Sequence, residues 1–287
     1  MRKSKMMKKP LSRKIADIVM FSILFLLCGS YLYILIWGII MGCMTHNQTV
    51  MEPFKLPKEW HFENYIHAFK KLEVNETNMF GMIGNSLWLA IGGAFCDVFC
   101  SLMVAYACAK FNFFGRNIVH GTSLVIMTLP IIGAGSAAYR LIYGLGINDS
   151  PLFLINYCTG FGTQYIILFG FMKNLSWSYA EAAYIDGASE SQVFFKVMIP
   201  MCISPICALM LLRVIGIWND YNTPILYLQE MPPIATGLKL FELDMTYDAS
   251  KHILIAASML SIMPVLVLFL IFNKTLLDLD LGGGIKG

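Results

Sequence analysis

The chain has 287 residues, of which 57% are hydrophobic and only 14% are charged, and its mean hydropathy is +0.64. Soluble domains carry about a quarter charged residues, so this composition excludes a protein that buries its apolar side chains in one aqueous core. The net charge is only +3, and Lys and Arg are concentrated before the first apolar run, which is typical of the cytoplasmic flank of a membrane span and not of a nucleic-acid-binding surface.

Six segments have about the length and apolar character that a helix needs to cross a bilayer, about 20 residues. The predicted spans cover residues 16–44, 83–109, 118–144, 151–171, 201–218 and 253–272. The first is longer than the about 7–15 apolar residues of a secretory signal peptide, which favours a retained span. Lys and Arg are more frequent at both termini and after the second and fourth spans than in the long loops 45–82 and 222–252. Both termini are therefore predicted to be cytoplasmic.

The segment after the fourth predicted span, residues 173–200, is expected to be cytoplasmic and structured. Two pairs have the spacing of a capping box, which satisfies the free N–H groups at a helix start: Ser178 with Glu181, and Ser189 with Gln192. Gly187 between them is suited to the left-handed conformation that ends a helix. We therefore predict a helix, a glycine turn and a second helix that ends near Pro200. Its exposed apolar residues indicate an interface.

The same segment contains an ordered pattern: Glu181-Ala182-Ala183, three residues, Gly187, nine residues, and Val197-Met198-Ile199-Pro200. This pattern resembles the EAA loop of binding-protein-dependent ABC importer permeases. Other segments are similar to the sugar-type permeases of that family, in particular to the maltose-transport type with six spans. They are Leu56-Pro57, Phe62-Glu63-Asn64-Tyr65, Asn85-Ser86-Leu87, Ala105-Tyr106-Ala107, Lys110-Phe111, Gly115-Arg116-Asn117, Trp218-Asn219-Asp220-Tyr221 with Pro224, and Gly283-Gly284-Ile285-Lys286-Gly287.

The resemblance implies an all-α integral membrane fold of the type I importer permease, with six transmembrane helices and a cytoplasmic helix–turn–helix coupling loop. The corresponding organisation is a cytoplasmic tail over residues 1–15 and a permease domain over 16–287, with the coupling loop at 173–200 and a cytoplasmic tail at 273–287. The implied location is a bacterial inner or plasma membrane.

The resemblance also implies partners: a dimer of ABC ATPase subunits, a second permease, an extracytoplasmic solute-binding protein and membrane lipid, but no nucleic acid. This chain would not be an enzyme and would bind no cofactor, because ATP and Mg²⁺ belong to the ATPase. Two groups of residues would contact that ATPase: the coupling-loop residues Glu181, Ala182, Ala183, Asp186, Gly187 and Pro200, and the tail residues Gly284 and Lys286.

Sugars are bound by planar polar groups and aromatic faces. Trp218, Asn219, Asp220 and Tyr221, at the outer end of the fifth predicted span, are therefore a candidate substrate path or gate. A contact with the solute-binding protein is an equal alternative for them.

Charged residues inside spans are costly and indicate a specific role. Asp97, Arg140 and Arg213 are such residues. They are predicted to pair with each other or with backbone carbonyls in the helix bundle, and the alternative, that Asp97 lines the substrate path, stays open. Gly38 and Gly42 have the small-xxx-small spacing of close helix packing.

Three rival functions were weighed. A permease for amino acids, peptides or polyamines has the same fold, but the sugar-type segments argue against it. An ion-driven secondary carrier should show internal repeats, which are not visible. A membrane enzyme lacks support because there is no HExxH, GxSxG or paired-carboxylate motif. The eight cysteines and five histidines have no ligand spacing, so no metal site is predicted.

Overall fold

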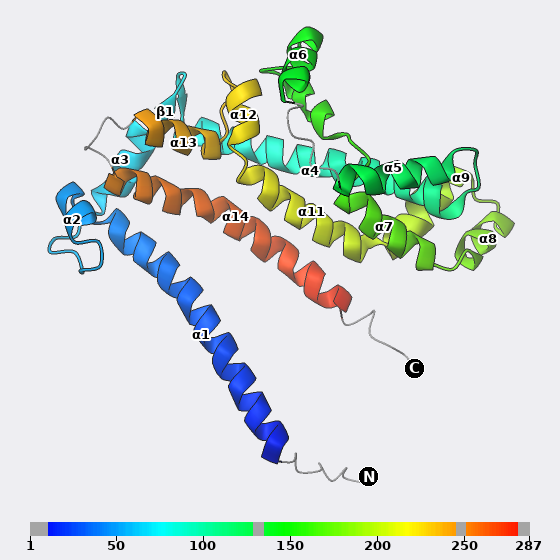
Figure 1. The fold of residues 1–287 in the computed structure, drawn as a ribbon, viewed down its shortest axis with the longest axis horizontal. Helices are drawn as coiled ribbons and strands as arrows, with labels where there is room; N and C mark the ends of the chain where they lie inside the picture. The colour runs from blue at the N-terminus through cyan, green and yellow to red at the C-terminus, as the bar shows by residue number, and fades with distance from the viewer. Residues whose placement is uncertain (1–10, 129–134, 245–250, 281–287) are drawn as a thin grey trace. The chain divides into compact units, whose positions relative to one another are not determined.

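The structure is a computed structural model of the chain that describes residues 11–128, 135–244 and 251–280. This part of the chain is almost entirely helical (Figure 1). The strands described in it are β1 (Glu73–Val74) and β2 (Thr77–Asn78), an antiparallel hairpin in which Glu73 pairs with Asn78 and Val74 with Thr77. The predicted all-α class is therefore confirmed apart from this small hairpin.

The helices follow one another along the chain with short connections. They are α1 (Leu11–Gly42), α2 (His46–Met51), α3 (Glu63–Lys71), α4 (Met79–Lys110), α5 (Arg116–Thr128), α6 (Gly135–Leu145), the 3₁₀ helix η1 (Pro151–Tyr157), α7 (Thr163–Asn174), α8 (Ser178–Ile185), α9 (Glu190–Gln192), the π-helix η2 (Val193–Met198), α10 (Ile199–Met201), α11 (Ile203–Trp218), α12 (Asn222–Tyr227), α13 (Ile234–Asp244) and α14 (Lys251–Asp280).

The chain divides into two compact units, one drawn from Met1–Ala68 and Met245–Leu260, the other from Phe69–Asp244 and Ser261–Gly287. In the first unit, α1 is exposed along most of its length and packs closely only near its end. A Cβ atom added at Gly38 would lie 2.7 Å from the Met259 sulfur, and one at Gly42 would lie 3.2 Å from the Ala256 Cα. The prediction of close helix packing at these two glycines is confirmed.

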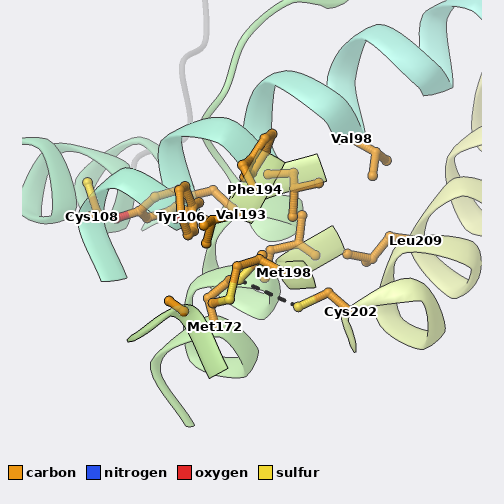
Figure 2. Packing of buried hydrophobic residues seen from close by; sticks show 14 residues of the cluster. Val98, Tyr106, Cys108, Met172, Val193, Phe194, Met198, Cys202 and Leu209 are labelled. Atoms are coloured by element: carbon orange, nitrogen blue, oxygen red, sulfur yellow. Dashed lines mark hydrogen bonds between the residues drawn. The ribbon is translucent and has the colours of Figure 1, made fainter. Parts of the chain in front are cut away.

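The second unit is organised around α4, which packs most extensively against α7 and α11. The core at the end of this unit that carries residues 173–200 is a cluster of buried apolar side chains, mainly from α4, α7, α8, η2 and α11 (Figure 2). Figure 2 shows Tyr106 beside Val193 and Phe194, with Met198, Cys202 and Met172 grouped beneath them. Helices far apart in the sequence thus pack against one another and against the predicted coupling loop.

Three of the described helices are long and apolar enough to cross a membrane: Arg13–Gly42, Met79–Lys110 and Lys251–Ile271. They correspond to the first, second and sixth predicted spans. A fourth is obtained if the helices Glu190–Met201 and Ile203–Trp218, which meet at an angle of 76°, form one bent span. The total of six spans stays a prediction.

The other two predicted spans differ from a single long helix. The third includes residues 129–134, which are outside the described residues. The fourth is divided into η1 and α7, because Gly160 and Gly162 between them have φ values of +68° and +97°. These values are in the left-handed region that interrupts a right-handed helix. Residues 151–171 therefore do not form one continuous helix, and the predicted span there stays a prediction.

Candidate functional site

The predicted glycine turn lies where the sequence placed it. Helix α8 ends in a Schellman motif: the Gly187 N–H donates to the Tyr184 carbonyl at 3.0 Å, and the Ala188 N–H donates to the Ala183 carbonyl at 2.9 Å. Gly187 has a φ of +82°. This conformation is unfavourable for residues with a Cβ atom, so Gly187 fixes the angle between the two arms of the loop.

Of the two predicted capping boxes, one is present and one is wrong. Ser189 accepts a hydrogen bond from the Gln192 N–H, and the Gln192 side chain accepts one from the Ser189 N–H. At the start of α8 the N-cap is Trp177, without a side-chain cap. The Ser178 hydroxyl lies 2.7 Å from that of Ser176, because Ser178 is already inside the helix and cannot reach back over the first turn.

The second arm continues through α9, η2 and α10 and ends at Met201, close to the predicted end at Pro200. Pro200 has no N–H group, and its ring would clash with the Lys196 carbonyl in a regular α-helix. The wider π turn immediately before it is consistent with this clash. After Cys202 the chain bends by 76° into α11.

The loop has a buried and an exposed face. Ala180, Val193 and Met198 are fully buried in the core cluster. On the other side, the predicted ATPase-contact residues Glu181, Ala182, Asp186, Gly187 and Pro200 are exposed and Ala183 is partly buried. Ile185 is 86% exposed. A large apolar side chain in that setting indicates a protein partner, and no sequence motif had pointed to it.

A hydrogen bond closes the turn from one arm to the other. The Tyr184 hydroxyl of α8 donates to Glu190 Oε2 of α9 at 2.7 Å. Burial, and then this carboxylate, raises the pKa of Tyr184 above its ordinary value, so the phenol remains the hydrogen-bond donor into alkaline pH. The Trp177 ring lies 6.1 Å from that of Tyr184 and 6.0 Å from Phe111. The loop is therefore a fixed element and not an open coil.

Two of the three predicted intramembrane charges form an ion pair. Arg213 Nε of α11 lies 2.6 Å from Asp97 Oδ2 of α4, and Asp97 is only 3% exposed. The Thr159 hydroxyl donates to Asp97 Oδ1 at 3.1 Å, and the Arg213 guanidinium lies 5.7 Å from the centre of the Tyr157 ring. The prediction that Asp97 and Arg213 pair is confirmed. Arg140 is exposed in α6.

Thr159 and Tyr157 were missed by the sequence analysis. Neither belongs to a motif, and they reach Asp97 and Arg213 only because η1 and the residues that follow it lie along α4. The contact at Gly93 marks this approach, since a Cβ there would lie 2.9 Å from the Tyr157 ring.

The candidate path residues at the end of α11 have different surroundings. Trp218 is 4% exposed and belongs to the packed interior. The Asn219 side chain donates to the Ile215 carbonyl at 2.8 Å, and Asp220 Oδ1 accepts the N–H groups of Asn222 and Thr223 at the start of α12. Tyr221 is 37% exposed, and the Lys239 Nζ lies 5.8 Å from the centre of its ring. The tail residues Gly284 and Lys286 lie outside the described residues.

The class of the protein follows from its fold. The structure superposes with a TM-score of 0.73 on a chain from the crystal structure of a bacterial ABC transporter involved in the import of the acidic polysaccharide alginate, at 22% identity, covering 93% of this chain and 99% of that one. The fold is thus that of a type I ABC importer permease.

Residues 98–281, more than half of the chain, match the family described as binding-protein-dependent transport system inner membrane component. The chain belongs to this family. Its relatives include the diacetylchitobiose uptake system permease protein NgcG of Streptomyces coelicolor, 25% identical over 84% of this chain and 79% of that protein. Another is the arabinooligosaccharides transport system permease protein AraQ of Bacillus subtilis, 28% identical over 80% of this chain and 81% of the relative.

Proposed function

We propose that this chain is the membrane permease of an ATP-driven importer for an oligosaccharide or a sugar derivative. The family membership supports the importer class, and the names of relatives such as NgcG and AraQ support the sugar substrate. A permease for amino acids or peptides has no comparable support, and neither has an ion-driven carrier. The proposal includes a location in the inner membrane, with both termini in the cytoplasm.

The observation that carries the coupling role is the exposed face of the helix–turn–helix around Gly187. A rigid, mostly uncharged surface with an 86% exposed Ile185 suits a groove on a separate ATPase subunit. The ATPase dimer holds ATP and Mg²⁺ and hydrolyses the nucleotide. Closure of that dimer moves the loop and biases the permease between inward-open and outward-open states.

The substrate path is proposed to use the exposed ring of Tyr221 at the outer end of α11. An aromatic face can stack on the apolar side of a sugar ring, and the neighbouring Asn219 and Asp220 hold that end in shape through their backbone contacts. The buried Trp218 supports the same end from inside. Asp97 would act at a distance, by fixing α4 against α11.

The assembly can be tested by purifying the protein in mild detergent from its native membrane and identifying the chains that accompany it. We expect an ATPase, a second permease and a solute-binding protein. Ile185→Ser, which alters only an exposed side chain, should release the ATPase and retain the second permease. The matched control is Ile118→Ser, a comparable change at a residue that is 69% exposed on α5.

If the ATPase stays bound to the Ile185 variant as it does to the control, the coupling surface is elsewhere. If no ATPase accompanies the unmodified chain, the importer assignment itself is contradicted. Uptake of labelled oligosaccharides against labelled amino acids then separates the two substrate classes.

A further inference from the structure

The end of α2 and the loop between α2 and α3 expose an unusual amount of apolar surface outside any predicted long helix. Met51 and Phe54 are each 80% exposed, and Leu56 is 65% exposed. Further along, the rings of Trp60 and Phe62 stack at 5.8 Å and are also exposed. Exposing such a cluster of apolar side chains to water is costly, so we expect lipid or another chain to cover it.

The loop holds these side chains in a defined arrangement. The Gln48 amide of α2 donates to the Leu56 carbonyl at 2.8 Å and accepts the Lys58 N–H at 3.3 Å. The end of the loop is tied to α1 by the His61 N–H, which donates to the Cys43 carbonyl at 2.9 Å. These hydrogen bonds hold the backbone that carries the apolar side chains in one conformation.

One contact fixes the depth of the loop relative to α1. The Trp37 indole N–H donates to the Pro53 carbonyl at 3.1 Å, although α1 continues to Gly42. Trp37 therefore lies about 7–8 Å before the outer end of the helix at 1.5 Å per residue. Its side chain is directed further toward the helix N-terminus. The chain after α2 folds back beside α1 (Figure 1).

The length of α1 relates that depth to the bilayer. From Lys14, at the charged end, to Trp37 the helix rises about 35 Å, slightly more than the about 30 Å hydrocarbon layer. Trp37 and Pro53 are then level with the outer boundary between acyl chains and headgroups, where Trp and other aromatic residues are enriched. α1 is exposed along most of this length, and the Trp37–Pro53 contact holds the loop beside it.

We propose that the surface formed by Met51, Phe54, Leu56, Trp60 and Phe62 inserts into the outer leaflet of the membrane as an interfacial anchor. The charges next to it suit this position. Lys55 and Lys58 lie 2.9 and 3.6 Å from Glu52, and with Glu59 the loop has no net charge that would repel it from the lipid phosphates. Long Lys side chains can reach the headgroups while their stems lie along apolar surface.

The test places a fluorescent bimane label at Phe54→Cys in the full chain, reconstituted in vesicles of phosphatidylcholine and phosphatidylglycerol. Nitroxide groups on the upper acyl chain should quench this label several-fold more strongly than aqueous iodide does. Glu59→Cys is the matched control, because Glu59 is in the same loop with a side chain 83% exposed; its label should show the opposite preference. Labelled unmodified protein supplies the background from the native thiols.

Equal access of iodide to both labels would overturn the proposal. Protection of the Phe54 label from iodide only after the solute-binding protein is added would also overturn it, and would assign the surface to protein docking. Either result leaves the importer assignment intact, because that assignment depends on the family and not on this loop.

Discussion

At the scale of single residues, the ion pair between Asp97 and Arg213 has the largest energetic consequence. Asp97 is almost fully buried, whereas the Arg213 side chain is 34% exposed. Removing one partner of a buried pair leaves an uncompensated charge, at a cost of about 3–5 kcal/mol when both are buried. The exposure of Arg213 reduces that cost when Asp97 is the residue removed.

We expect Asp97→Leu to destabilise the protein by about 2–3 kcal/mol, because the guanidinium loses its counter-ion. The double variant Asp97→Leu with Arg213→Leu should recover part of the loss. Thermal unfolding of the purified protein in detergent checks both. Transport by the single variant provides a second readout: normal uptake with reduced stability would contradict a role for Asp97 in the substrate path.

Gly187 allows a comparison that isolates backbone conformation. A Cβ at Gly187 would meet nothing within 4 Å, and the same is true at Gly216 in α11, but only Gly187 has a positive φ. Gly187→Ala should therefore cost about 1–2 kcal/mol, whereas Gly216→Ala should be neutral or stabilise the protein by up to about 1 kcal/mol. The difference in melting temperature between the two variants measures the cost of the left-handed conformation at residue 187. Equal melting temperatures would show that the turn relaxes without cost.

At the scale of elements, the contact of α1 with α3 and α14 depends on two glycines with different surroundings. A Cβ at Gly42 would lie 2.6 Å from the Tyr65 hydroxyl and 3.2 Å from a backbone atom of Ala256. Tyr65 is held in place because its hydroxyl donates to the Ile39 carbonyl at 2.8 Å. A Cβ at Gly38 would meet only the flexible end of Met259.

We therefore expect Gly42→Ala to destabilise the protein by about 1–3 kcal/mol through overpacking. Gly38→Ala is its matched control and should cost clearly less, since the thioether can move. At about 2–4 °C per kcal/mol for a domain of this size, a thermal melt distinguishes the two. A Gly42 variant that melts with the Gly38 variant would mean that α3 shifts to make room.

The helices and turns show which parts of the structure could be predicted from the sequence. Long apolar runs predicted α1, α4 and α14, because an uninterrupted run of that length has few other solutions. The break between η1 and α7 was not predicted, since a glycine in an apolar run can be helical or left-handed and only the packing along α4 decides. The N-cap of α8 was predicted at Ser178, one residue too late, because the helix already begins there and Trp177 is its cap. Gly187 and Ser189 were located correctly, because their local hydrogen bonds alone specify the turn. The partners of Asp97 were only partly predictable, since Thr159 meets it through tertiary packing.

At the scale of the whole molecule, the proposed function makes uptake depend on ATP hydrolysis by a separate ATPase subunit. We expect uptake into cells or proteoliposomes to stop when ATP is removed or vanadate is added, and to continue when a protonophore collapses the ion gradient. The measurement is the uptake of a labelled oligosaccharide by the reconstituted transporter over a range of ATP concentrations. Uptake that follows the ion gradient would instead identify a secondary carrier.

The bend at Cys202 relates a displacement of the arm before it to a rotation of α11 after it. The arm from Glu190 to Met201 is about 18 Å long and α11 is about 24 Å long at 1.5 Å per residue, and they meet at 76°. If both helical segments stay rigid and move together, a displacement across the shorter one rotates the longer one about the bend. Because α11 is the longer helix, we expect its far end, next to Asn219, to be displaced further than the shorter arm. On the proposed function, the ratio of the two helix lengths would then set how far a movement of the coupling loop is carried along α11.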